Sequence, residues 1–112
     1  LILPAISMAN PIVNYTATPQ PVLSVVLVDA FLDITIHEKV RVAIENAWKD
    51  GIAFVEVEMG SVEFMDSSGV GLLVGLHKRL GGGQKRVILK NLRPTLKSIF
   101  KLLCLEDLFE FA

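Results

Sequence analysis

The sequence lacks a second cysteine, an excess of either charge and any long apolar run. Cys104 alone cannot form an internal disulfide, and its leucine neighbours predict a small core residue. With 11 basic and 12 acidic residues, the net charge of -1 excludes the overall basic field that nucleic-acid-binding domains use. No apolar run approaches the ~20 residues of a membrane-spanning helix. We therefore expect a cytoplasmic protein with no membrane span and no direct contact with nucleic acid.

What the sequence does contain is enough apolar residues for one globular domain. Of its 112 residues, 52% are apolar and 21% are charged, a balance typical of chains that fold without metals or disulfides. We assign residues 12–112 to this domain and residues 1–11 to an N-terminal extension. The opening "LILPAISMAN" does not begin with methionine, and we interpret it as vector-derived, with Met8 as the native start. The end of a signal peptide is the alternative.

Apolar periodicity predicts an alternation of strands and helices. The predicted strands lie at 12–18, 22–29, 52–59, 85–90 and 108–112, and the predicted helices at 36–48, 69–80 and 94–103. Thr35 and Glu38 have capping-box spacing at the start of the first helix. The apolar face of the third helix consists of Leu96, Ile99, Phe100 and Leu103.

This order of elements predicts an α/β fold. We expect a mixed β-sheet of four to five strands packed with three to four α-helices. An antiparallel hairpin opens the sheet, and parallel strands joined by right-handed crossovers follow it.

The stretch "EFMDSSGVGLL", residues 63–73, places two serines where a strand pattern changes to a helix pattern. A helix cap made by Asp66 or Ser67 is the default interpretation. A nucleophilic serine would need a nearby base, but the only histidines are His37 and His77. His77 lies two to three turns along the same helix, more than ~10 Å away. We therefore expect no catalytic residue and no enzyme activity.

The glycines of this stretch do not form a nucleotide-binding loop. The pattern G-x-G-x-x-G fails at Val74, where the third glycine belongs. No lysine or arginine lies between Lys49 and Lys78, so side chains here would repel a polyphosphate. We expect neither a cofactor nor a metal site.

The longer stretch "VEFMDSSGVGLLVGLHKRL", residues 62–80, resembles the signature of STAS domains, particularly bacterial anti-sigma factor antagonists. "FLD" at residues 31–33 and "IFKLLCLEDLFEF" at residues 99–111 occur in the order that this family has. The resemblance implies that the serine after the aspartate, here Ser67, is phosphorylated by an anti-sigma factor that is a serine kinase. Ser68 is the alternative target.

The resemblance also implies a partner-switching function. In this family the unphosphorylated antagonist binds the anti-sigma factor and releases a sigma factor, phosphorylation abolishes that binding, and a serine phosphatase restores it. The residues expected to bind the partner are Asp33, Met65, Asp66, Ser67, Ser68 and Gly69. Whether Met65 lies in the interface or in the core stays open. The alternative function is a STAS scaffold or an accessory subunit of a transport complex, in which the serines only cap a helix.

Ile34 occupies a position where members of the family often have a polar residue. We expect its side chain to be buried beneath the first helix, and the alternative is that it suits a different partner. A phosphoserine at position 67 would carry about -1.5 to -2 charges beside Asp66 and near Glu63, which predicts an effect on a partner rather than on the fold.

Overall fold

The structure, a computed structural model, describes residues 11–112. The extension assigned to residues 1–11 therefore lies almost entirely outside the described residues. In chain order the elements are β1 (Ile12–Thr16), β2 (Val22–Val26), β3 (Phe31–Leu32), α1 (Ile34–Ala47), β4 (Phe54–Glu58), β5 (Phe64–Met65), α2 (Ser67–Leu80), β6 (Arg86–Lys90), α3 (Pro94–Leu102), a 3₁₀ turn (Glu106–Leu108) and β7 (Phe109–Phe111).

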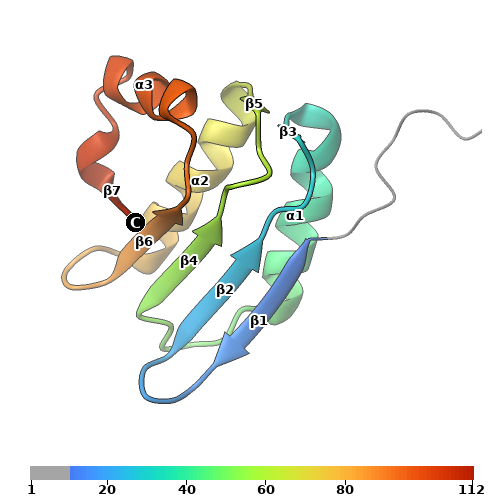
Figure 1. Ribbon diagram of the computed structural model, residues 1–112. Helices are drawn as coiled ribbons and strands as arrows, with labels where there is room; N and C mark the ends of the chain where they lie inside the picture. The colour runs from blue at the N-terminus through green and yellow to red at the C-terminus, as the bar shows by residue number, and fades with distance from the viewer. Residues whose placement is uncertain (1–10) are drawn as a thin grey trace, which may run out of the picture.

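Five strands form the main sheet, in the order β1-β2-β4-β6-β7 (Figure 1). β1 pairs with β2 in the antiparallel sense, and the remaining neighbours are parallel. The expected mixed α/β sheet with an opening hairpin is confirmed. β3 and β5 are too short to show a periodic pattern, and they pair with each other in a separate two-stranded ladder.

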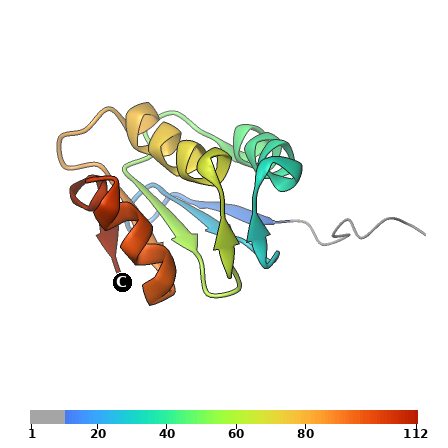
Figure 2. The same cartoon turned by 90° about the horizontal axis from the view of Figure 1, so that it is seen from above.

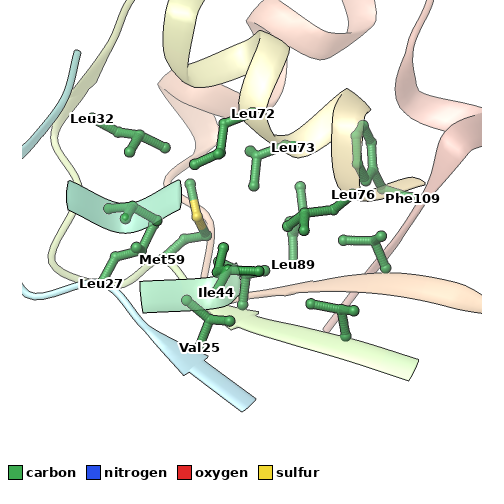
Figure 3. Packing of buried hydrophobic residues seen from close by; sticks show 14 of the residues in the cluster. Val25, Leu27, Leu32, Ile44, Met59, Leu72, Leu73, Leu76, Leu89 and Phe109 are labelled. Atoms are coloured by element: carbon green, nitrogen blue, oxygen red, sulfur yellow. The ribbon is translucent and has the colours of Figure 1, made fainter. Parts of the chain in front are cut away.

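The core lies between the main sheet and two helices. Figure 2 shows α1 and α2 side by side over one face of the sheet. Alternate residues of the central strands point toward them and are buried in matching register: Leu23, Val25, Val55, Val57, Val87 and Leu89. Figure 3 shows Ile44 of α1 and Leu73 and Leu76 of α2 among Val25 and Leu89 of the sheet. This packing fixes the positions of both helices relative to the strands.

The third helix is shorter than its apolar pattern predicts. Leu96 and Phe100 are buried as expected, and the Phe100 ring packs 5.3 Å from that of Phe109. Leu103, however, is 52% exposed, because α3 ends at Leu102.

Cys104 is exposed, so its assignment to the core is wrong. It adopts a left-handed backbone conformation with φ 57°. The amide of Leu105 then donates to the carbonyl of Phe100 at 2.8 Å, which closes the helix end in the manner of a Schellman motif. The reversal turns Leu105 toward the core in place of Cys104.

In the part of the chain that the structure describes, no helix has the length and apolar character needed to cross a membrane. α1 and α2, the longest of these helices, each have 14 residues.

Candidate partner-binding site

The two serines lie at one end of the molecule, beside the β3–β5 ladder and the starts of α1 and α2 (Figure 1). In this ladder Phe31 pairs with Phe64, and Leu32 pairs with Met65. The carbonyl of Ala30 accepts hydrogen bonds from the amides of Glu63 at 2.7 Å and Phe64 at 3.1 Å. These bonds hold the segment before α1 against the segment before α2.

Asp66 caps α2 and also bonds to the first turn of α1. Its Oδ1 accepts hydrogen bonds from the Ser68 amide at 2.9 Å, the Ser68 hydroxyl at 2.5 Å and the Gly69 amide at 3.2 Å. Its Oδ2 accepts a bond from the amide of Ile34 at 3.2 Å. The cap predicted as Asp66 or Ser67 is therefore Asp66, and it joins two helix N-termini.

The pKa of the Asp66 carboxyl lies below its usual value. The hydroxyl of Ser68 is the main cause, because it donates to the charged carboxylate. The backbone amides of Gly69, Ile34 and Ser68 act in the same direction, while partial desolvation opposes them. Asp66 therefore carries a negative charge beside the serines at neutral pH.

Asp33 caps α1 by the same local geometry. Its Oδ1 accepts hydrogen bonds from the Thr35 amide at 3.0 Å and the Thr35 hydroxyl at 2.6 Å. Thr35 is thus a partner of the cap rather than the cap itself, and the predicted capping box with Glu38 does not form. The side chain of Glu38 instead pairs with Arg41.

Ser67 and Ser68 differ in accessibility. Ser67 is the first residue of α2, its side chain is exposed, and its hydroxyl has no hydrogen-bond partner among residues 11–112. Ser68 is half-buried, and its hydroxyl is bonded to Asp66. Sequence alone left the choice between these serines to a resemblance, and in the structure Ser67 is the more accessible of the two hydroxyls.

Met65 and Gly69 are buried between α2 and the β3–β5 ladder, beneath the two serines. Met65 is only 4% exposed, which places it in the core. Gly69 is also buried, and a Cβ atom at this position would lie 2.4 Å from the carbonyl oxygen of Leu32 and 2.6 Å from Cγ of Met65. Neither residue presents a side chain to a partner, but both determine how closely α2 packs on the ladder.

Ile34 is 69% exposed, so the expectation that it is buried beneath α1 is wrong. The buried face of α1 consists of Ile36, Val40 and Ile44, and helical geometry turns the side chain of Ile34 away from them.

A short repeat underlies the whole site, and periodicity did not reveal it. Residues 31–35 (Phe-Leu-Asp-Ile-Thr) and 64–68 (Phe-Met-Asp-Ser-Ser) each form a two-residue strand, an aspartate cap and a helix start. The signal present in the sequence was the repeated pattern of an aromatic residue, an apolar residue, an aspartate, any residue and a hydroxyl residue.

Neither histidine forms a hydrogen bond with Ser67 among the described residues. His77 packs against the ring of Phe109, 6.4 Å between ring centres. His37 lines a groove of about 300 Å³ between α1 and α2, whose two arginines are paired with Glu38 and Glu45. The described part of the chain holds no cluster of three or more potential metal ligands.

Comparison with known proteins identifies the family. The model of the STAS domain matches residues 14–112. The chain belongs to the STAS domain family. The expected STAS-like fold is confirmed by solved structures, and the anti-sigma factor antagonist SpoIIAA in its unphosphorylated form matches with a TM-score of 0.69 and 26% identity, over 90% of this chain and 88% of that one.

The phosphorylated form of SpoIIAA, from Bacillus, matches with a TM-score of 0.64 and 26% identity, over 90% of this STAS chain and 91% of that chain. Among curated proteins, the anti-sigma-B factor antagonist of Staphylococcus aureus strain NCTC 8325 is 27% identical over 95 residues, or 85% of this chain and 88% of its own length. The anti-sigma-B factor antagonist of Listeria monocytogenes is 32% identical over 80 residues, or 70% of this chain and 69% of its own length. These relatives support a regulatory role.

Proposed function

We propose that this STAS domain is an anti-sigma factor antagonist switched by phosphorylation of Ser67. Unphosphorylated, it binds an anti-sigma factor that is a serine kinase, and the sigma factor is released. The kinase phosphorylates Ser67 and the complex dissociates, and a serine phosphatase restores binding. The domain itself catalyses no reaction and acts in the cytoplasm.

The observation that carries this proposal is the position of the Ser67 hydroxyl. It is exposed on the first turn of a helix that Asp66 already caps, and no bond of the fold uses it. A kinase can therefore reach this hydroxyl without unfolding the helix, whereas modification of Ser68 would break its bond to Asp66.

A phosphate on Ser67 would act on the interface more than on the fold. The phosphate adds about -1.5 to -2 charges beside Asp66. The N-terminus of α2 offsets part of this charge, by about 0.3–1 kcal/mol. In a protein interface the same charge must be desolvated, and a loss of ~3 kcal/mol would weaken binding more than a hundredfold. Both forms of SpoIIAA match this chain, which is in keeping with a fold that is retained on phosphorylation.

The test is phosphorylation by the cognate anti-sigma kinase with Mg-ATP, with the phosphate located by mass spectrometry. We expect one phosphate, on Ser67, in the wild-type protein and in Ser68→Ala, and none in Ser67→Ala. Binding of the kinase by the phosphorylated protein should be at least about a hundredfold weaker. The proposal would be wrong if neither serine carried phosphate and Ser67→Asp bound the kinase as tightly as the wild-type protein does.

A further inference from the structure

Exposed apolar side chains gather around Ser67. Within residues 11–112, seven large apolar side chains are exposed, and three of them lie at this site: Phe31 (55%), Ile34 (69%) and Phe64 (50%). We call Phe31, Ile34 and Phe64 the apolar patch. Contiguous exposed apolar groups of this kind mark interaction surfaces more often than scattered ones do.

The two aromatic rings of the apolar patch are held against each other. Phe31 and Phe64 are partners in the β3–β5 ladder, and their rings meet edge to face with 6.0 Å between centres. The residues that alternate with them, Leu32 and Met65, are anchored in the core. The partner-facing rings therefore lose little conformational entropy on binding, a property of residues that dominate interfaces.

Ser67 lies next to the apolar patch, at the position equivalent to Ile34. The short repeat places Phe31 and Phe64 at one pair of equivalent positions, and Ile34 and Ser67 at the other. The amide of Ile34 donates to the carboxylate that caps the helix of Ser67, so the two positions adjoin. A phosphate on Ser67 would thus put a negative charge next to the position of Ile34, at the end of the molecule where the β3–β5 ladder carries Phe31 and Phe64.

The rim of the apolar patch is acidic. Asp33 and Glu63 are sequence neighbours of Ile34 and Phe64, and the Asp66 carboxylate accepts a hydrogen bond from the Ile34 amide. A protein that fits this surface presents an apolar pocket bordered by basic residues, since charge complementarity favours such an encounter.

We infer that the apolar patch is the anchor by which this domain docks an apolar, basic-rimmed surface of its anti-sigma factor, with phosphorylated Ser67 expelling that surface from the patch. This inference rests on the proposed function. It assigns the binding energy to Phe31 and Phe64 and the control of binding to Ser67, so that the two can be separated by mutation.

The experiment measures affinity for the purified cognate anti-sigma kinase by isothermal titration calorimetry. Phe31→Ala and Phe64→Ala should each weaken binding by about tenfold or more, as expected of interface anchors. Phe64→Leu, which keeps apolar surface, should retain most of the affinity. The matched control is Leu102→Ala, because Leu102 is 83% exposed at the end of α3 and should have no effect. Circular dichroism and Tm confirm that each variant is folded.

The outcomes distinguish the inference from the proposed function. If the wild-type protein binds the kinase and Ser67 is phosphorylated, but the alanine variants bind within twofold of it, only the patch assignment is wrong. If the wild-type protein does not bind the kinase at all, both the proposed function and the assignment of the patch are wrong. Self-association in analytical ultracentrifugation that both alanine variants abolish would show that a second copy occupies the patch, which would overturn the inference.

Discussion

Residues 31–35 and 64–68 build one local structure twice and use it differently. In both segments an outward phenylalanine precedes an inward apolar residue and an aspartate that caps a helix through the residue two places on. The residue after the aspartate is exposed in each, but it is Ile34 in the first segment and Ser67 in the second. The comparison teaches that the helix cap and the exposed, unbonded hydroxyl are separate features at neighbouring positions.

The largest expected effect concerns Gly69, which occupies the position equivalent to the buried Ile36 in the first segment. Gly69→Ala places a methyl group 2.4 Å from the carbonyl of Leu32, so α2 must move away from the ladder. We expect a loss of about 2–3 kcal/mol of unfolding free energy in urea denaturation. The control is Gly71→Ala, where a Cβ meets nothing within 4 Å and helix propensity predicts a gain of up to ~1 kcal/mol. Equal stability of the two variants would contradict the packing argument.

The second effect compares the two caps. Asp33→Ala removes bonds within α1 only, and we expect Tm to fall by about 4–8 °C. Asp66→Ala removes bonds to both helices and should lower Tm roughly twice as far. Differential scanning calorimetry of both variants decides the matter. A larger fall for Asp33→Ala would mean that the bond from Ile34 to Asp66 contributes little.

The third effect is a pH dependence at Asp66 in the second segment. The pKa of Asp66 is lower in the folded protein than the ordinary aspartate value of 3.8. The charged Asp66 carboxylate therefore contributes its full stabilisation above pH 3.8, and this contribution is lost as the pH falls through the lowered pKa. Asp66→Asn keeps a capping residue but does not titrate. The stability advantage of the wild-type protein over this variant should therefore shrink between neutral pH and about pH 2.5 in urea denaturation.

A matched group serves as the internal check on this pH experiment. Glu38 also has a lowered pKa, chiefly because of its hydrogen bond to Arg41, but it titrates equally in both proteins and cancels in the difference. An unchanged difference between the wild-type protein and Asp66→Asn across this range would contradict the assignment of the low pKa to Asp66.

The smallest effect on stability is expected for Ile34→Ser, which gives the first segment the hydroxyl of the second. Ile34 is mostly exposed, so the free energy of unfolding should change by no more than ~0.5 kcal/mol. If the apolar patch anchors the partner, affinity for the anti-sigma kinase falls while stability does not. A parallel loss of both would indicate a structural role for Ile34.

Sequence reasoning predicted the main sheet and the long helices because apolar residues recur in them at a regular spacing, over several helical turns or along several strand residues. The buried residues of β2, β4 and β6 alternate as expected, and α2 follows its apolar pattern to Leu80. The ladder of β3 and β5 was missed, since two-residue strands carry no period and depend on pairing between distant segments.

At the site, sequence reasoning identified the segment but not the fine geometry. The position of Ser67 came from a resemblance, while the exposure of Ile34 and the burial of Met65 depend on how α1 and α2 pack. The error at Cys104 has the same origin: a reversal at the end of α3 moves the apolar pattern by one residue, and local composition cannot show it.

The unbonded hydroxyl of Ser67 has a kinetic consequence. Adding a phosphate there breaks no hydrogen bond within the described part of the fold. Under the proposed function, phosphorylation of Ser67 then does not have to wait for a conformational change. The rate of the proposed switch would then be set by the turnover of the kinase and the phosphatase that the proposed function requires. Both rates respond to enzyme concentration, and the response can be made fast or slow without altering this domain.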